Sequence, residues 1–185
     1  MNDKYSRRTF IGKTGMTIAA AGTVMSVGNS AKSQEQTGSG MMGGGEIDAV
    51  EFGKSLRGVG FNLLVTDIDA TVKFSKDILL THTIMTDDGF AILRSGETLW
   101  MLHGDETYHS NPLGGIVAGV KGRGQGIELR LYDIDPDEAE ARANESDYII
   151  LAGCANKPHG LRECYILDPD GYCWVISRPL RDGEE

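Results

Sequence analysis

Two apolar runs flank the polar segment Asp168–Gly171 near the end of the chain. The runs are rich in Tyr, Ile, Val and Trp, which strands favour, and the segment between them holds the turn formers Asp, Pro and Gly. This pattern predicts a β-hairpin. A four-residue turn pairs Leu167 with Tyr172. The next pair outward is then Ile166 with Cys173.

A weaker copy of this hairpin lies at 91–102. Its Trp100 precedes Trp174 by 74 residues, and Ile92 and Leu93 precede the similar pair Ile166 and Leu167 by the same distance. The segment 60–69 also recurs, 66 residues later, as 126–135, with Gly, Leu, Asp, Ile and Asp identical. The chain therefore contains two similar halves.

Each copy of the repeated segment is typical of a strand that runs into a helix. Either of two aspartates in each copy can accept hydrogen bonds from the first N–H groups of that helix. These candidates are Asp67 or Asp69 in the first half and Asp133 or Asp135 in the second. The helices are predicted at about 70–79 and 136–146.

A further strand is predicted between each helix and its hairpin, at about 81–85 and 148–152. Each half is therefore β-α-β-β-β, and the two modules cover 59–103 and 126–179. A glycine-rich connector joins them. The second half has eight more residues between helix and hairpin, and we expect them in the loop 153–162.

Alternation along the strands divides their side chains between two faces. One face should point at the helices and form the core, with the residues Phe61, Leu63, Val65, Ile127, Leu129 and Leu131. The other face mixes apolar, polar and charged side chains, as binding cavities do. It supplies the ligand-binding candidates Asn62, Met101, His103, Glu128, Arg130 and Tyr132. The alternative is that Glu128 and Arg130 lie at a solvated edge of the sheet and bind no ligand.

The beginning of the chain carries an export motif. Residues 6–13, SRRTFIGK, fill every position of the twin-arginine pattern S-R-R-x-F-[IL]-x-K. A mildly apolar run follows at 14–27, too short for a comfortable membrane span. Cleavage sites with small residues lie at 31–33 or 29–31. We predict a signal peptide at 1–33, engagement of the twin-arginine export machinery, and a periplasmic or extracellular protein; the alternative is a chance arginine pair in a disordered tail.

The segment 34–58 contains a Gly- and Ser-rich stretch and is predicted to be a flexible linker. The whole chain has a formal net charge of −9, from 18 basic and 27 acidic residues. Residues 1–33 hold five of the basic residues and one acidic residue, so the remainder carries 13 against 26, or −13. Nucleic-acid binding needs a basic face, so this balance predicts no nucleic-acid partner.

The order of elements resembles that of the vicinal oxygen chelate superfamily, in particular its glyoxalase and bleomycin-resistance branch. The most specific stretches are 157–163, KPHGLRE, and 168–172, DPDGY. One departure is His159, which stands where that branch often has an aromatic residue. The resemblance implies a domain at 59–180 with an α+β fold, in which two βαβββ modules pair into a curved mixed sheet that encloses a cavity. It also implies a homodimer, since similar proteins are mostly homodimers, some of them swapped.

Metal-dependent members of this superfamily take one ligand from the first strand and one from the last strand of each half. The repeat offsets map these positions to Gly60, Met101, Gly126 and Val175. Gly and Val offer no ligand atom, and a Met thioether is a soft ligand unsuited to the metals of this family. His103 with Glu128 makes only two ligands. We therefore predict no metal and no other cofactor.

The sequence contains three cysteines, Cys154, Cys164 and Cys173. In the predicted hairpin, Cys164 lies diagonal to Cys173 at about 7–8 Å between Cα atoms, which is beyond easy bridging. We expect buried free thiols. One alternative is a disulfide between Cys154 and Cys164, because an exported chain meets an oxidising compartment. Another is that one of the three thiols is exposed.

The leading hypothesis is an exported, metal-free protein that binds a small organic molecule, as the resemblance implies for the bleomycin-resistance type. A second hypothesis is a lyase or isomerase with an atypical site, in which His103 or Glu128 acts as general base. A third is a non-catalytic accessory subunit. No nucleophile motif and no phosphate-binding loop occurs in the sequence.

Overall fold

The computed structural model describes residues 48–184. The predicted signal peptide and most of the predicted linker lie outside these residues. Among the residues described, no helix is long and apolar enough to cross a membrane.

The first half of the domain is a βαβββ module. Its strands form a mixed sheet in the order β1-β4-β3-β2, with β1 parallel to β4 and the other pairs antiparallel. Its elements are β1 Asn62–Val65, α2 Ile68–Asp77, β2 His82–Thr86, β3 Phe90–Ser95 and β4 Thr98–Gly104.

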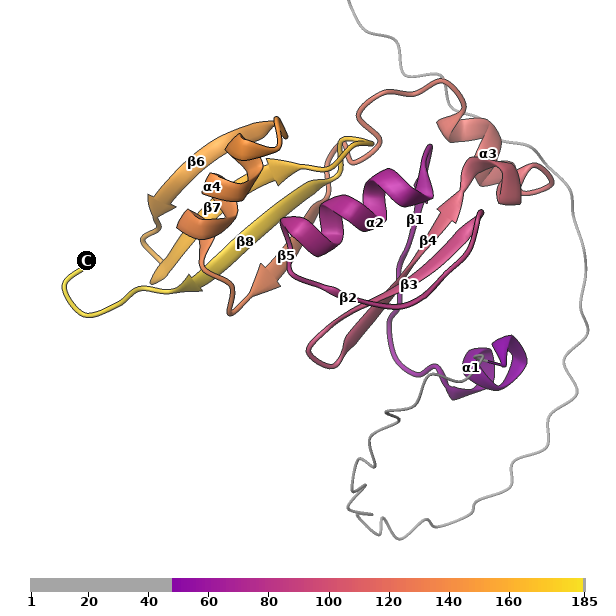
Figure 1. The fold of residues 1–185 in the computed structure, drawn as a ribbon, viewed down its shortest axis with the longest axis horizontal. Helices are drawn as coiled ribbons and strands as arrows, with labels where there is room; N and C mark the ends of the chain where they lie inside the picture. Colours follow the sequence, from indigo (N-terminus) through magenta and orange to yellow (C-terminus); the bar gives the residue numbers. More distant parts are fainter. Residues whose placement is uncertain (1–47, 185) are drawn as a thin grey trace, which may run out of the picture. The chain divides into compact units, whose positions relative to one another are not determined.

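The second half repeats this topology as a separate sheet in the order β5-β8-β7-β6. Its elements are β5 Glu128–Tyr132, α4 Pro136–Glu145, β6 Ile150–Asn156, β7 Leu161–Leu167 and β8 Cys173–Pro179. Figure 1 shows each sheet with its own helix on one face, α2 against β2–β4 and α4 against β6–β8. The predicted α+β fold of two βαβββ modules is confirmed.

Three short helices were not predicted. α1 (Ala49–Ser55) lies within the interval assigned to the linker and is capped by Asp48, whose carboxylate accepts hydrogen bonds from two N–H groups of its first turn. The 3₁₀ helix η1 (Asp105–Tyr108) and α3 (Pro112–Val117) lie in the connector between the modules. The extra residues of the second half also differ in place, because part of them extends β6 as far as Asn156.

The caps of the two long helices show how the repeat should be aligned. Asp67 caps α2 and Asp135 caps α4, and both accept N–H hydrogen bonds through their side chains. These caps are 68 residues apart, so the offset of 66 read from the sequence was wrong by two positions. The strand register agrees, since Asn62 lies beside Met101 whereas Arg130 lies beside Val175. The structural equivalent of Asn62 is therefore Arg130.

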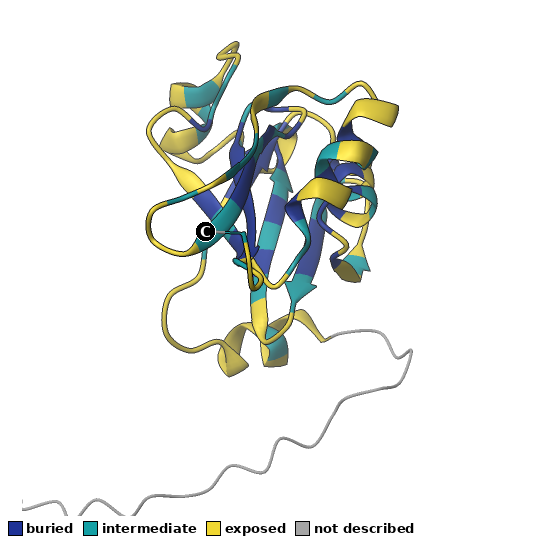
Figure 2. Cartoon of the chain, turned by 90° about the vertical axis from the view of Figure 1, so that its left-hand side faces the viewer, coloured by how far each residue is buried: buried dark blue, intermediate teal, exposed yellow. Residues whose placement is uncertain are grey.

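The predicted core face is largely confirmed. Leu63, Val65, Leu129 and Leu131 belong to one apolar cluster with residues of both helices, and Phe61 packs against it half-buried. Ile127 was wrongly assigned, because it precedes β5 and is exposed. Figure 2 shows the buried strands beside helices whose outer sides are exposed.

The two repeat-related tryptophans meet where the halves join. The rings of Trp100 and Trp174 lie 5.5 Å apart, centroid to centroid, and Phe61 stacks on Trp100 at 5.9 Å. Both tryptophans belong to the apolar cluster that spans the two modules. Aromatic rings bury large areas, so this contact contributes strongly to holding the halves together within the chain.

The predicted hairpin forms, but its register differs by one residue. Leu167 pairs with Cys173, so the turn holds five residues instead of four. The Asp168 carboxylate explains the longer turn, because it accepts hydrogen bonds from the backbone N–H groups of Asp170 at 3.0 Å and Tyr172 at 2.9 Å. As a consequence Cys164 pairs with Ile176, three residues beyond Cys173 on β8, and not diagonally to Cys173 as expected.

The same turn reaches across to the first module. The Asp170 carboxylate accepts the backbone N–H of Thr66 at 3.1 Å, and the Tyr172 hydroxyl donates to the carbonyl of Leu64 at 3.1 Å. The connector presses against the turn at Gly124, where a Cβ would lie 2.5 Å from the Tyr172 Cα atom. Glycine is therefore needed at that position.

Arg123 completes this contact, which we call the intermodule clamp and define as Asp105, Arg123, Asp170 and Tyr172. The guanidinium donates to both Asp105 carboxylate oxygens, at 2.7 and 2.6 Å, and to the Leu64 carbonyl at 3.0 Å. Its Nε lies 3.6 Å from Asp170. The side chains of Arg123 and Asp170 are only 2% and 3% exposed. Two carboxylates and a carbonyl therefore surround one buried cation.

Replacing Arg123 with Met should lower the free energy of unfolding by about 3–5 kcal/mol, because it leaves buried Asp170 without its cation. Arg181→Met is the matched control. Arg181 pairs with Asp135 at a side chain that is 64% exposed, so its loss should cost less than about 1 kcal/mol. Urea denaturation of both variants measures this difference. Equal losses would contradict the role given to the clamp.

Asp168 should make the stability depend on pH. Burial raises the pKa of its carboxyl to about 6, against the opposing effect of hydrogen bonds from the Tyr172 N–H and the Trp174 indole. Because the pKa of Asp168 is higher in the folded than in the unfolded state, protonation of this carboxyl favours folding. This contribution to the free energy of unfolding is complete below the unfolded-state pKa and is lost as the pH rises through about 6. Lowering the pH from 7 to 4 should therefore stabilise the wild type relative to Asp168→Asn by about 2–3 kcal/mol. Urea denaturation at both pH values measures the gap, and an unchanged gap would refute the assignment.

Candidate functional site

A groove of about 670 Å³ runs along β5, which is the end strand of its sheet. One wall is β5 itself and the residues that follow it. The other wall is formed by the turn between β3 and β4, together with aromatic side chains from both halves. The lining residues are Phe61, Leu80, Ser95, Gly96, Thr98, Trp100, Glu128, Leu129, Arg130, Leu131, Tyr132, Asp133, Ile134 and Trp174.

Arg130 connects the groove to a buried polar cluster. Its guanidinium donates to Glu128 at 3.2 Å and to the carboxylate of Glu163 on β7. Glu163 also accepts the hydroxyl of Tyr165 at 2.8 Å and is hydrogen-bonded to Nε2 of His159 at 3.0 Å. The Glu163 side chain is 1% exposed, so three neighbours satisfy a carboxylate that water does not reach.

These contacts determine the ionisation of Glu163. Burial alone raises the pKa of a carboxyl group, but the hydrogen bonds from His159, Tyr165 and Arg130 outweigh it and hold the pKa of Glu163 below its usual value. The hydrogen bond to Glu163 in turn raises the pKa of the Tyr165 hydroxyl. An ionised carboxylate whose oxygens are already occupied is a poor general base, so Glu163 serves to orient Arg130.

The structure divides the predicted ligand-binding residues among three places. Glu128, Arg130 and Tyr132 all line the groove, with the Arg130 guanidinium 6.0 Å from the centre of the Tyr132 ring. Met101 lines a different hollow, of about 640 Å³, between β4 and α1. Asn62 lies beside Met101 in the sheet. Among residues 48–184, no hydrogen bond or ion pair joins Asn62 to Glu128 or Arg130.

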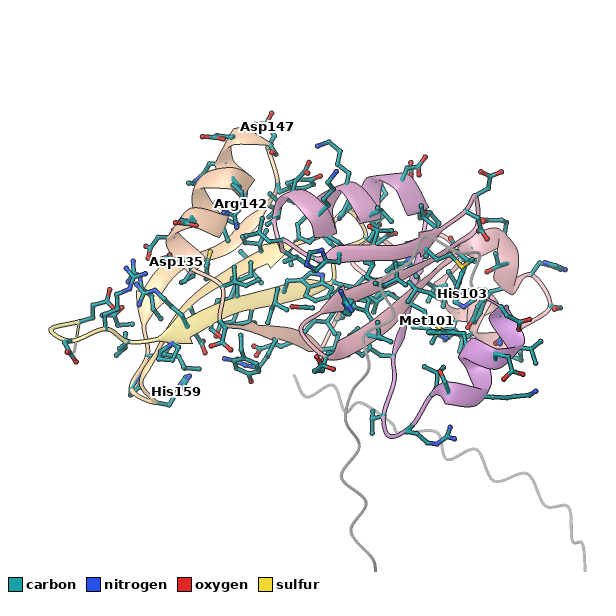
Figure 3. All side chains as sticks on the ribbon, turned by 60° about the horizontal axis from the view of Figure 1, so that its bottom comes forward. Met101, His103, Asp135, Arg142, Asp147 and His159 are labelled. Carbon is teal, nitrogen blue, oxygen red and sulfur yellow. The ribbon has the colours of Figure 1, made fainter. Side chains whose placement is uncertain are left out.

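His103 lies in a third environment. Its ring contacts the rings of Phe90 and Tyr108, at 4.7 and 5.0 Å between centroids, and Nδ1 lies 3.2 Å from the Thr107 hydroxyl. Burial lowers the pKa of this histidine. Figure 3 shows His103 and Met101 at one end of the domain and His159, which contacts Glu163, at the other. His103 therefore does not share a site with Arg130.

Comparison with protein-family models and with curated proteins finds no match by sequence. Solved structures do match. A glyoxalase/bleomycin resistance protein/dioxygenase family enzyme from Burkholderia phytofirmans PsJN is 17% identical, with a TM-score of 0.55, over 65% of this chain and 97% of that chain. A glyoxalase-related enzyme from Fulvimarina pelagi is 15% identical, with a TM-score of 0.54, over 70% and 95%. The chain has the glyoxalase and bleomycin-resistance fold. At such low identity the likeness concerns the fold and leaves the function to be argued from the site.

Some members of the superfamily that the sequence resembles bind a metal, and the residues here do not suit one. The side chains that stand side by side on the first and last strands are Asn62 with Met101, and Arg130 with Val175. A thioether is soft, a valine has no donor atom, and a guanidinium repels a cation. The side chains at this position therefore do not fit a metal ion.

Sequence reasoning missed Glu163, Tyr165 and the part played by His159. The signal was available, because Glu163 and Tyr165 are two positions apart on one predicted strand and so point to the same face. The strand order then places β8 between β5 and β7, with Val175 paired to both Arg130 and Tyr165. A buried carboxylate two strands away from an arginine on the same face is the pattern that identifies this cluster.

Proposed function

We propose that this protein binds a small organic molecule in the groove along β5, without a metal. The observation that supports this is the combination of aromatic walls, from Phe61, Trp100 and Trp174, with a few polar groups at one strand. Ligand sites typically have such walls, and their few polar groups fix the orientation of the ligand. Arg130 is held in place by Glu163, so the site is organised before the ligand arrives.

The charges of the groove indicate the kind of ligand. Glu128 and Asp133 contribute two negative charges, whereas the one positive charge, on Arg130, is already paired with Glu128 and Glu163. A free anion would have to compete with these carboxylates. The groove therefore favours an apolar or flat aromatic body with a neutral polar or cationic end, as does the acidic composition of the chain.

Binding is better supported than catalysis. A general base must lie within reach of the proton that it removes and have a suitable pKa. His103, the histidine considered for this role, lies outside the groove, and Glu163 has a lowered pKa and three hydrogen-bond partners. Glu128 is tied to Arg130. The two residues considered as general base for a lyase or isomerase, His103 and Glu128, therefore lack free access to the groove.

The ligand can be identified by native mass spectrometry of protein purified from its own host. The same spectrum gives the mass of the assembly, for which we propose a homodimer, and shows whether a metal is present. A ligand-bearing chain without metal is the expected result. Protein that repeatedly lacks any ligand, and that binds none from a host extract, would count against a binding function.

Glu128→Gln should weaken binding of the recovered molecule by about 1–3 kcal/mol, because the negative charge that faces the polar end of the ligand is lost. The side chain of Glu128 is 50% exposed, so the melting temperature should change little. Isothermal titration measures binding and calorimetry measures stability. Binding that is unchanged per folded molecule would show that this wall of the groove is not the site.

Arg130→Ala serves a different purpose in the same experiment. It should weaken binding and also lower stability, since it leaves the buried Glu163 carboxylate without its cation. Glu163→Gln is the matched control. It keeps the size of the side chain and leaves Arg130 present but less well oriented, so its loss of binding should be smaller than that of Arg130→Ala.

We further propose that the protein is exported by the twin-arginine route. Replacing Arg7 and Arg8 with Lys should trap the uncleaved precursor in the cytoplasm, because the arginine pair is what the export machinery recognises. Fractionation and immunoblotting of the host measure this. The matched control is Lys4→Arg, which alters a basic residue outside the motif and should be exported normally. Unchanged export of the double Lys variant would refute the proposal.

A further inference from the structure

Two cysteines face each other across β6 and β7. The ladder between these strands pairs Ala152 with Tyr165 and then Ala155 with Glu163, so its register shifts between the two pairs. Two residues of β6, Gly153 and Cys154, therefore stand opposite a single residue of β7. Such an extra residue is a β-bulge. The residue opposite the bulge is Cys164.

The sulfur atoms are close. The Sγ atoms of Cys154 and Cys164 and a carboxylate oxygen of Glu140 all lie within 4.8 Å of one another. The Cys164 thiol also lies 3.6 Å from the carbonyl of Ala152 on the facing strand. Directly opposed residues of an antiparallel pair have Cβ atoms about 4.5–5.5 Å apart, and a disulfide needs about 3.5–4.5 Å. A small movement of the bulge is enough to join the two sulfurs.

Helix α4 holds the bulge in this position. Glu140 accepts the backbone N–H of Cys154 at 3.1 Å. At Gly153, a Cβ would lie 2.8 Å from a carboxylate oxygen of Glu140, so the bulge and the helix are in close contact. Cys173 does not compete for a bond with Cys164. Its neighbour Trp174 points into the core, so Cys173 points to the other face of the sheet, whereas Cys164 belongs to the core.

We propose that Cys154 and Cys164 form a disulfide once the protein has left the cytoplasm. The proposal rests on the inferred export, since disulfides persist in oxidising compartments, and is independent of ligand binding in the groove. The bond would tie β6, the end strand of its sheet, to β7 where their ladder is interrupted. Leu151 on β6 and Ile149 just before it are exposed, so holding β6 in the sheet also protects an apolar edge.

The oxidant is a second disulfide, either that of a small molecule such as oxidised glutathione or that of an oxidoreductase. Cys154 is the more accessible thiol, and Cys164 is buried. The Cys154 thiolate attacks the oxidant to give a mixed disulfide and one thiolate leaving group. The Cys164 thiolate then attacks the Cys154 sulfur and releases the second leaving group, and the two thiol protons end on the two released thiols.

Both thiols react slowly at neutral pH. Burial raises the pKa of Cys164 to about 11, and it also raises that of Cys154, with a further contribution from the hydrogen bond to Glu140. The thiolate is the reacting form, so oxidation should accelerate as the pH rises from 7 to 9.

The test compares two redox states of the same full chain. The protein is reduced, incubated with oxidised glutathione, denatured and treated with a maleimide. We expect one maleimide per chain, on Cys173. Before labelling, the oxidised chain should be lighter than the reduced chain by two hydrogen atoms. The oxidised form should melt about 5–10 °C higher, because the bond restricts the unfolded chain. Peptide mapping then locates the bond.

Two variants complete the design. Cys173→Ser is the matched control and should keep both the bond and the rise in melting temperature. Cys154→Ser should melt as the reduced wild type does, whether or not oxidant is added. Three maleimides per oxidised wild-type chain, or a bond that includes Cys173, would overturn the proposal. So would about one zinc per chain that Cys154→Ser and Glu140→Gln both remove, because these three side chains would then be metal ligands.

Discussion

The arrangement of this domain depends on one buried cation. Arg123 comes from the connector between the modules and lies among Asp105, Asp170 and the carbonyl of Leu64. A charge in such a place must be paired, because the cost of removing it from water is recovered only by close partners. The partners belong to both halves, so they can all reach Arg123 only when the halves are packed together. The groove between the modules exists because that packing is fixed.

The two halves are similar in topology but different in chemistry, and this difference forms the candidate site. The position equivalent to Asn62 in the second half is Arg130, whose guanidinium donates to the buried carboxylate of Glu163 on β7. The clamp is also one-sided, since its turn belongs to β7 and β8. A duplicated scaffold thus presents one polar cluster and one aromatic wall to the same groove.

The fold could be predicted from the sequence because each element follows from local signals, such as the caps at Asp67 and Asp135 and the turn at Asp168. The errors came from spacing. Matching identical letters gave an offset of 66, although the caps show 68, and counting turn residues missed the hydrogen bond that lengthens the hairpin. Three of the predicted site residues line the groove. Glu163 was missed because its importance depends on packing between strands far apart in sequence.

The clamp has a consequence for the order of folding. The hydrogen bonds from Thr66 to Asp170 and from Tyr172 to Leu64 join residues separated by 104 and 108 positions. They cannot form until the ribosome has made nearly the whole domain, and closing such long loops slows folding. The first module must wait, with part of its apolar face uncovered, for the second. During that interval the uncovered apolar face is open to aggregation, so the second module protects the first as well as completing it.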